Sequence, residues 1–455
     1  MKRLLIFYLS FNLNNFSAAQ TFSDSISNSI DGAINFLVST QQKETFETKY
    51  FKGEWPAYVT NLETSLYLGS RGDSAWDSQC FSNAMIHNIL AEIVLTHPKY
   101  ARLIPALDLS LSNIKSFERE KGFAFWHVLP PAPWWKKKKH FKNPELYYQT
   151  RPNNYQYKGN FLNKYANIAN DADDTGLGYL AYLNSNKIKK QWSRNDTIIL
   201  PLFLDSLYST WRDTRKVRRS FSTYNLTYGY VHRSGAYLTW LSKESFYYPL
   251  RLFFPFRHKQ NLPMGNNDLD CVVNCNVLRV LNAYELQTTA GYKESISFIS
   301  DALNSKKHCF TCGIYYPSEF TLHYFASEAY HEGVSELKAA VVSSIPDILA
   351  AQNTNGSWSS VLPLNNFHVT ALCLNALLNS GVKTDSVIQA IETGIHFLIS
   401  SSKQNTNGNF WTGGVFFTSG YTIRHTHVWR SDVVTTSIVL EALVHYLDMI
   451  SENNK

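Results

Sequence analysis

Twelve predicted helices of two alternating kinds are the feature that most constrains the fold of this chain. Six are apolar on nearly every side, and we expect them to begin near Asp77, Asp171, Asp268, Ser318, Phe367 and Asp432. The other six carry apolar residues on one face only, and we expect them over residues 24–42, 103–118, 198–211, 293–303, 334–352 and 385–402. A helix that is apolar all round is buried, whereas an amphipathic helix covers a core with one face. The alternation therefore predicts an all-α toroid of six helical hairpins, an (α/α)6 ring with inner and outer helices.

The composition is compatible with one large domain. Of the 455 residues, 44% are hydrophobic and 17% are charged, so the chain can bury a sizeable core. We expect residues 1–19 to be a signal peptide, because Lys2 and Arg3 precede an apolar run and small residues end at Ala19. Residues 20–455 are then expected to form a single toroid domain. The prediction is an exported protein, periplasmic or secreted, or one that is peripheral to a membrane.

One connection in the chain is unusually long. It contains two strand-like segments, at 228–231 and 236–241, and then the aromatic stretch 246–256, which we call the aromatic ribbon. We expect a small β-hairpin and aromatic insertion around residues 221–260. Long loops in compact domains are usually lids or binding elements, so the ribbon is predicted to cover the ring or to contact a membrane.

The formal net charge of +7 comes largely from two basic runs, at residues 136–140 and 215–219. Such runs are usually solvated loops, and they also suit peripheral contact with an anionic membrane surface. No nucleic-acid-binding motif accompanies them, so a nucleic-acid partner is not expected.

Two of the expected inner helices begin with the same phrase, Asn-Asp-x-Asp. The first, at residues 170–173, continues with Asp174 and Thr175, and the second occupies residues 267–270. An Asp at a helix start accepts hydrogen bonds from free N–H groups, but three carboxylates within four residues exceed what capping needs. Neighbouring like charges should raise the pKa of at least one of them. Because the N-termini of all inner helices point to one end of a toroid, both acidic starts should face a common cavity mouth.

Two connections between helices carry a further repeated pattern. Gln352, Gly356 and Trp358 form Gln-x-x-x-Gly-x-Trp, and Gln404 and Gly408 begin a second copy that ends in Phe410 followed by Trp411. Gln42 with Trp55 is interpreted as a third copy, interrupted by an insertion. These segments resemble the repeats of the squalene–hopene cyclase superfamily of α/α toroids. The Gln can bond free helix carbonyls, the Gly allows a turn, and the aromatic ring packs on the next hairpin.

The Asp-Ala-Asp-Asp-Thr sequence at residues 171–175 is similar to the Asp-x-Asp-Asp-Thr motif of class II terpene cyclases. The resemblance implies that Asp173 is the general acid that protonates an alkene or epoxide and that Asp171 and Asp174 position it. It implies an isoprenoid or other lipid-like substrate, and neither a cofactor nor a metal. Since a C=C bond is a very weak base, this chemistry needs a protonated carboxyl in a dry, aromatic-lined cavity. Aromatic residues make up 15% of the chain.

For substrate binding we predict four residues beside the acidic motif. Asp268 and Asp270, at the second acidic start, either cap their helix or serve as further functional carboxylates or divalent-metal ligands. Trp358 and Trp411 are the aromatic residues of the repeats and could also face the substrate.

Three alternatives remain open on the sequence. A secreted carbohydrate-active toroid, hydrolase or lyase, could use Asp173 and Asp270 as an acid–base pair if their carboxyls lay about 6–10 Å apart. A non-catalytic binding toroid would need only the scaffold. Protein prenyltransferase beta subunits share the single toroid and bind zinc through Asp, Cys and His, which Asp268, Cys271 and His368 match in order but not in spacing. Cys309 and Cys312 could form a local disulfide or join a zinc site with Cys271 and Cys275, although cysteines on a helix face are more often small core residues.

Overall fold

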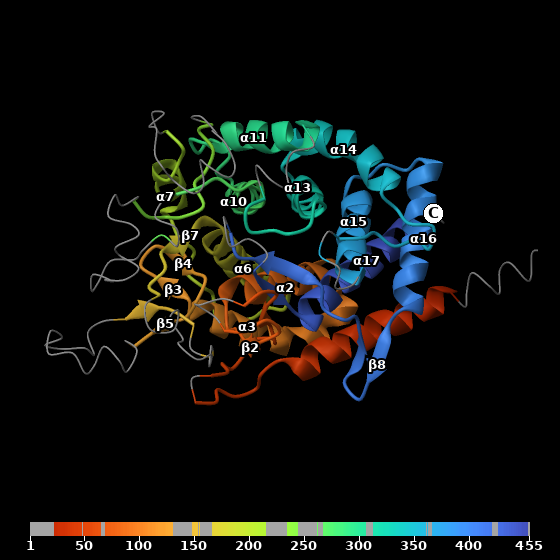
Figure 1. Ribbon diagram of the computed structural model, residues 1–455, viewed down its shortest axis with the longest axis horizontal. Coiled ribbons are helices and arrows are strands. Elements are labelled where there is room, and N and C mark those ends of the chain that lie inside the picture. The colour runs from red at the N-terminus through yellow and green to blue at the C-terminus, as the bar shows by residue number, and fades with distance from the viewer. Residues whose placement is uncertain are drawn as a thin grey trace, which may run out of the picture.

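The computed structural model describes residues 22–453 except for residues 48, 65–68, 131–147, 153, 155–165, 215–233, 244–261, 263–266, 306–312, 361, 363–365 and 421–425. Its helices form a two-layered ring (Figure 1). The predicted all-α (α/α)6 toroid is therefore confirmed. The predicted signal peptide, both basic runs, the aromatic ribbon and the pair Cys309 and Cys312 lie outside the described residues.

The inner layer consists of six helices: α2 (Cys80–Thr96), α6 (Ala172–Gln191), α10 (Cys271–Ala283), α13 (Thr321–His331), α15 (Phe367–Asn379) and α17 (Asp432–Asn453). Each packs on the next in chain order, and α17 packs on α2, which closes the ring. Their apolar residues are buried on nearly every side, as an inner position between outer helices and ring axis requires.

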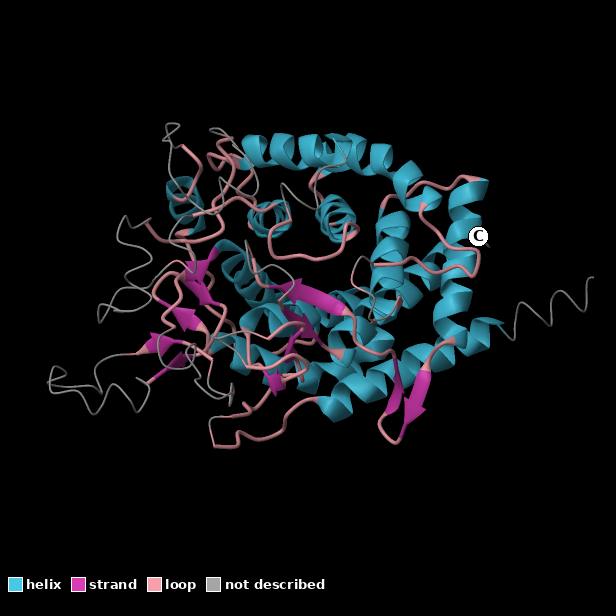
Figure 2. Ribbon diagram, viewed as in Figure 1, coloured by secondary structure: helices cyan, strands magenta, loops and turns pink. Residues whose placement is uncertain are grey.

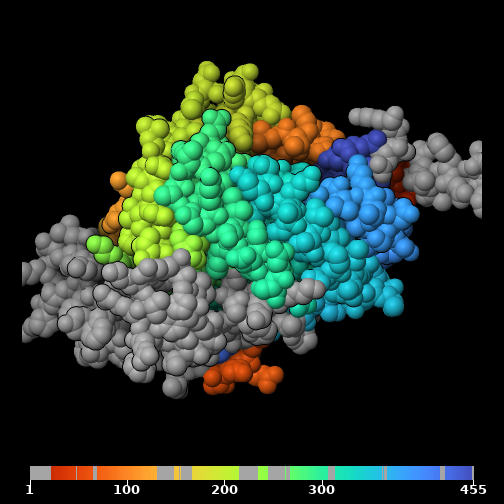
Figure 3. Space-filling view, turned by 90° about the horizontal axis from the view of Figure 1, so that it is seen from above, coloured from red at the N-terminus to blue at the C-terminus, as the bar shows by residue number. Residues whose placement is uncertain are grey.

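The outer layer consists of the helix over residues 22–40 and of α3 (Ile104–Lys115), α7 (Leu204–Thr210), α11 (Tyr292–Ser305), α14 (Lys338–Ala350) and α16 (Asp385–Ser400). Figure 3 shows α11 (green) and α14 (cyan) side by side on the outside of the molecule. α7 begins later than the predicted residue 198, because Pro201 disfavours helical backbone at the residue before it. Two 3₁₀ helices, η1 (Pro98–Leu103) and η3 (Ser335–Leu337), precede α3 and α14.

Strands occupy only the connections between helices (Figure 2). The largest sheet has the order β10 (Val415–Thr418), β11 (His427–Arg430), β1 (Tyr58–Asn61) and β2 (Ser74–Trp76). Its β1–β11 pair, with Val59 opposite Trp429, joins the first and last hairpins of the ring. The smaller sheets contain β3 (Glu118–Arg119), β4 (Gly122–Ala124) and β7 (Asn170–Asp171), β5 (Val128–Leu129) and β6 (Gln149–Thr150), and β8 (Lys403–Asn405) and β9 (Gly408–Phe410).

The predicted insertion around residues 221–260 is described only in part. Residues 234–243 lie against the ring and make single bridges, from Tyr237 to Arg212 and from Trp240 to Asp171. The other segment of the predicted hairpin, residues 228–231, lies outside the described residues.

The repeated Gln-x-x-x-Gly-x-Trp segments join neighbouring hairpins. Gln352 Nε2 donates to the carbonyls of Gly356 (3.1 Å) and Ala390 (2.9 Å), and Trp358 Nε1 donates to the carbonyl of Ile348 (2.7 Å). Gly356 has φ +86°, and a Cβ there would lie 2.3 Å from the carbonyl oxygen of Thr393, so only glycine fits.

The first hairpin repeats this arrangement with one correction to the sequence interpretation. Gln41, not Gln42, donates to the carbonyls of Gly53 (3.0 Å) and Ala106 (2.8 Å), and Trp55 Nε1 donates to the carbonyl of Leu37 (2.8 Å). The Gln side chain that turns inward at the end of the outer helix is therefore one residue earlier than the one the pattern suggested.

Among the described residues, only α17 is long and apolar enough to cross a membrane by length and composition. It is an inner helix of the ring, and 72% of the relevant window is buried inside the protein.

Candidate active site

The acidic motif lies where α6 begins, on a short strand that holds it in place. Asp171 is the N-cap of α6, and its Oδ1 accepts a hydrogen bond from the backbone N–H of Asp174 (2.6 Å). In β7, Asp171 is paired with Phe123 of β4, whose N–H donates to Thr175 Oγ1 (2.9 Å). The last Thr of the motif thus joins the helix to the sheet, and Asp171 has the capping role expected from the sequence.

Residues 237–241 connect the two acidic starts. Thr239 accepts a hydrogen bond from the N–H of Ala172 (2.7 Å) at its carbonyl and donates its own N–H to the carbonyl of Asp268 (3.0 Å). Asn267 Oδ1 accepts from the N–H of Trp240 (2.9 Å), and Asn267 Nδ2 donates to the carbonyl of Trp240 (2.6 Å). This segment fixes α6 and α10 side by side, so the two acidic starts face the same end of the ring, as expected.

Asp173 makes two side-chain hydrogen bonds across the inner ring. Its Oδ1 accepts from Asn276 Nδ2 of α10 (2.6 Å), and its Oδ2 accepts from the hydroxyl of Tyr316, in the connection before α13. Burial raises the pKa of Asp173 to about 6, against the lowering effect of the Tyr316 and Asn276 hydrogen bonds and of the Arg279 charge. The carboxyl therefore takes up a proton near neutral pH and not near pH 4.

The orientation of the Asn276 amide follows from its other neighbour. Arg279 Nη1 donates to Asn276 Oδ1 (3.3 Å), so the amide nitrogen must face Asp173. Arg279 is itself held by Glu332, which accepts from its Nε at 2.8 Å. Asn276 thus remains a hydrogen-bond donor to Asp173 in either protonation state of the carboxyl.

The flanking carboxyls form a buried group that retains protons. Asp174 is 1% exposed, and its carboxyl faces the thiol of Cys80 and the carboxyl of Asp171. Burial, followed by the nearby charge of Asp171, raises the pKa of Asp174 well above its usual range. Burial also raises the pKa of Asp171. We conclude that Asp174 is neutral around pH 7, because three adjacent buried carboxyls cannot all ionise.

At the second acidic start, the carboxyls bind the backbone and a tyrosine. Asp270 Oδ1 accepts from the N–H of Val272 (2.8 Å), and its Oδ2 accepts from the N–H groups of Ile314 (2.6 Å) and Tyr315 (3.3 Å). Asp268 Oδ2 accepts from the hydroxyl of Tyr315 (2.8 Å). Both residues therefore hold the segment that carries Tyr315 and Tyr316, and both carboxyls are fully buried.

An aromatic cluster surrounds Tyr316. The ring centroids of Phe81, Phe325 and Phe417 lie 5.7, 6.0 and 5.8 Å from that of Tyr316. Tyr315 stacks on Phe417 at 5.7 Å. The tyrosine that donates to Asp173 is thus packed among aromatic rings from α2, α13 and β10.

The structure brings together five of the seven predicted site residues, namely Asp171, Asp173, Asp174, Asp268 and Asp270. Trp358 and Trp411 lie elsewhere: both indoles are 0% exposed, and Trp411 Nε1 donates to the carbonyl of Leu398 (2.7 Å). Each indole packs between an outer helix and the neighbouring inner helix and is hydrogen-bonded to the outer one. They lie apart from the acidic residues, and their role in substrate binding stays a prediction.

Sequence reasoning missed Asn276 and Tyr316. A polar residue inside the apolar run of α10 was a usable signal for Asn276, whereas nothing in the sequence pointed to Tyr316. The prenyltransferase-like zinc set also fails, because Cys271 is in a disulfide bond and so offers no free thiolate. Cys275 is a buried free thiol.

Comparison with known proteins shows a shared fold. The type II terpene cyclase MstE from Scytonema has a TM-score of 0.53 and 13% sequence identity, with 94% of this chain and 99% of that chain covered. A protein from Actinoplanes gives 0.53 and 13%, covering 93% and 99%. Cellobiose 2-epimerase from Bacillus thermoamylovorans gives 0.50 and 10%, also covering 93% and 99%. At such low identities the likeness shows the α/α-toroid fold, which terpene cyclases share with a sugar epimerase.

No protein-family model matches the chain, and no curated protein is similar to it in sequence. The resemblance to terpene cyclases therefore depends on the motif, the fold and the surroundings of Asp173.

Proposed function

We propose that this protein is a terpene-cyclase-like enzyme in which Asp173 protonates a C=C bond or an epoxide of an isoprenoid and so starts its cyclisation. The observation that carries the proposal is the buried Asp173 carboxyl, which is held between Asn276 and Tyr316 beside an aromatic cluster. A general acid needs a pKa near the working pH, and burial raises that of Asp173 to about 6.

The hydrogen bonds indicate which oxygen carries the proton. Asn276 can only donate to Asp173 Oδ1, because Arg279 occupies the amide oxygen. A hydroxyl both donates and accepts, so the Tyr316 hydroxyl can turn to accept a proton bound to Oδ2. The transferable proton therefore belongs on Oδ2, and the double bond would have to approach that oxygen on the side of Tyr316.

The neighbouring carboxyls complete this arrangement. Asp171 caps α6 and thereby fixes the backbone that presents Asp173. Asp174, kept neutral by burial and by Asp171, adds no negative charge beside the acid. A second full charge there would raise the pKa of Asp173 further and weaken it as an acid.

The aromatic cluster supplies the second requirement of this chemistry. Protonation of an alkene leaves a carbocation, which aromatic faces stabilise without reacting as strong nucleophiles. Phe81, Phe325 and Phe417 surround Tyr316, whose hydroxyl donates to the acid. An isoprenoid is also apolar enough to bind among these rings.

The comparisons agree with a cyclase that consists of one toroid. The chain covers 99% of MstE, and a variant of that cyclase has been solved with geranylgeranyl dihydroxybenzoate, named there as its substrate. We include prenylated aromatic acids among the candidate substrates on this ground. Location in a periplasm, outside the cell or at a membrane surface stays a prediction, as does contact through the aromatic ribbon.

The carbohydrate-active alternative has less support. It assigned an acid–base role to Asp173 and Asp270, but both oxygens of Asp270 accept hydrogen bonds from backbone N–H groups. A carboxyl engaged in this way directs its oxygens at the backbone and not at a substrate.

The test is a product scan by mass spectrometry. Purified protein is incubated with squalene, its epoxide, a series of prenyl diphosphates and geranylgeranyl dihydroxybenzoate, beside the Asp173→Asn variant. We expect a cyclised isomer with wild-type protein and none with the variant, provided that circular dichroism shows both to be folded. If no polyprene is converted by folded wild-type protein, the proposal is wrong and sugar substrates are tested next.

A further inference from the structure

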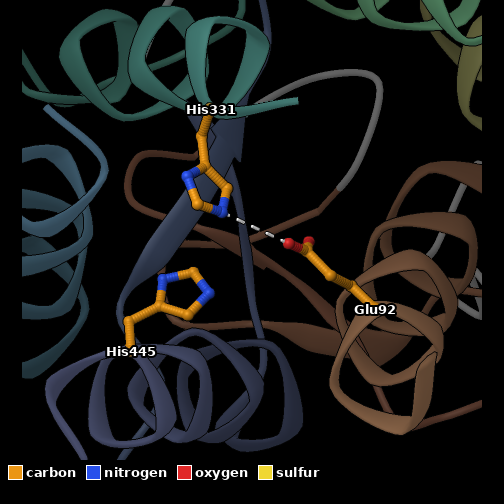
Figure 4. A group of neighbouring side chains, drawn as sticks. All are labelled: Glu92, His331 and His445. Atoms are coloured by element: carbon orange, nitrogen blue, oxygen red, sulfur yellow. Dashed lines mark ion pairs between the residues drawn. The ribbon is translucent and has the colours of Figure 1, made fainter. Parts of the chain in front are cut away.

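A second cluster of ionisable residues lies at the other end of the ring. Glu92 is near the C-terminus of α2, His331 is the last residue of α13, and His445 lies on α17 (Figure 4). At 1.5 Å per residue, Glu92 is about 18 Å along α2 from its start. Cys80, the first residue of α2, lies beside the acidic motif: burial and then the nearby Asp174 carboxyl raise the pKa of its thiol. The two clusters are therefore well separated.

The three side chains have the spacing of a metal site. One nitrogen of each imidazole and one carboxylate oxygen all lie within 4.8 Å of one another, and His331 Nε2 is 3.6 Å from Glu92 Oε1. Ligands that bind Zn²⁺ tetrahedrally at 2.0–2.1 Å are about 3.4 Å apart. The His331–Glu92 pair already has nearly that separation, and the set needs only side-chain rotation to contract around an ion.

The third member of the set, His445, lies on α17 with its ring turned toward the other two. Its Nδ1 is buried and has no hydrogen-bond partner among the described residues. The nearby His97 is not its hydrogen-bond partner, because the two ring nitrogens of His97 bond Thr96 and Asp448. Figure 4 draws the other ring nitrogen of His445, Nε2, on the side that faces Glu92 and His331, and a neutral imidazole can bind a metal through that nitrogen.

A neighbouring acidic set is a poorer candidate. Glu328 and Glu332 also lie near Glu92, but Arg279 forms ion pairs with both of them. Their charge is compensated without a metal. Glu92 makes its ion-pair contact with His331, and the charges of Glu328, Glu332, Arg279 and Lys187 also act on it.

We propose that Glu92, His331 and His445 bind a single Zn²⁺ ion. Two imidazoles and one carboxylate are a donor set that zinc favours, and the fourth position would be left to water. His331 is on α13, across the ring from α2, while α17 is the neighbour of α2. The ion would thus link opposite sides of the inner ring. With 45% of the His331 side chain exposed, an ion can reach the site from solvent.

The experiment is equilibrium dialysis of the metal-stripped full chain against ZnCl₂, with bound zinc measured by inductively coupled plasma mass spectrometry. We expect one Zn²⁺ per wild-type chain, and binding at least about tenfold weaker for His331→Gln and for His445→Gln. His331 is partly exposed, so its variant should fold even if that of His445 does not.

The matched control is His396→Gln, which removes an exposed histidine of α16 and should keep one ion per chain. The chain has 14 histidines, so the His331→Gln/His445→Gln double variant measures background binding. Thermal unfolding with and without ZnCl₂ provides a second readout, since an ion that binds only the folded state raises Tm. Equal zinc binding by wild type and the double variant, or none by either, would overturn the proposal.

Discussion

The two Asn-Asp-x-Asp starts, at α6 and α10, have the same sequence phrase but different surroundings. At α10, Asp270 binds three backbone N–H groups, and these bonds hold the chain in place. At α6, the capping role is taken by Asp171, so Asp173 is free to face side chains, namely Asn276 and Tyr316.

The difference shows how an acid becomes available for chemistry. Burial raises the pKa of Asp270 to about 7 and that of Asp173 to about 6, so both carboxyls can hold a proton. The two differ in their partners, because Asp270 faces backbone donors and Asp173 faces side chains. Asp173 can therefore be the functional carboxyl of the first motif, because its neighbour Asp171 already caps the helix.

The largest expected effect separates Asp173 from Asp270. Asp173→Asn should lower cyclisation at least about 1000-fold with little change in unfolding, because it removes the proton donor. Asp270→Asn should lower stability by about 2 kcal/mol, since its amide would oppose the N–H groups of Ile314 and Tyr315, but should keep activity per folded molecule. Product formation and urea unfolding measure the two effects. Loss of activity in a folded Asp270→Asn variant would mean that both starts are catalytic.

The second effect is on the pH dependence of stability. The pKa of Asp173 is about 6 in the folded protein and near 3.8 when unfolded, so the unfolded chain loses this proton first as pH rises. Its contribution to stability is present below about pH 4 and is lost as pH rises through 6, an effect of about 3 kcal/mol. Urea unfolding at pH 4 and pH 8 should therefore show a smaller fall for Asp173→Asn than for wild type. If the free energy of unfolding decreased equally in the two proteins, the raised pKa would belong to another residue.

A smaller effect is expected from Tyr316→Phe. The hydroxyl stabilises ionised Asp173 and lowers its pKa, so its loss should move the falling limb of the pH–activity profile to higher pH. We expect about a tenfold loss of activity as well, because the proton on Oδ2 is no longer oriented. Phe325→Leu serves as the control, since it changes the aromatic cluster without removing a hydrogen bond to the acid. An unshifted profile in Tyr316→Phe would remove Tyr316 from the proposed mechanism.

The smallest effect concerns the tryptophans of the repeats. Trp358→Phe removes the hydrogen bond to the carbonyl of Ile348 and should cost about 1 kcal/mol of stability, with product formation unchanged. Chemical denaturation and the product assay together decide this. Selective loss of activity at full stability would support the prediction that Trp358 binds substrate.

The sequence was sufficient for the ring and for part of the site. The alternation of apolar and amphipathic helices predicted the toroid, and the starts of α15 and α17 were predicted at Phe367 and Asp432, where the structure has them. The acidic residues were found because charges at the start of an apolar helix are unusual. The hydrogen-bond partners of Asp173 were not found from the sequence. Asn276 and Tyr316 are about 100 and 140 residues away from Asp173, and no local pattern links them to it.

Helix periodicity and capping are local properties, so the sequence alone determined the elements, their order and the position of the acidic motif in the chain. Which carboxyl caps, which one faces Tyr316, and which glutamine turns inward were decided by the tertiary structure. The same holds for Glu92, His331 and His445, which three separate helices bring together. Burial and hydrogen bonding depend on what the rest of the chain places around a group, and these contacts set its charge and its chemistry.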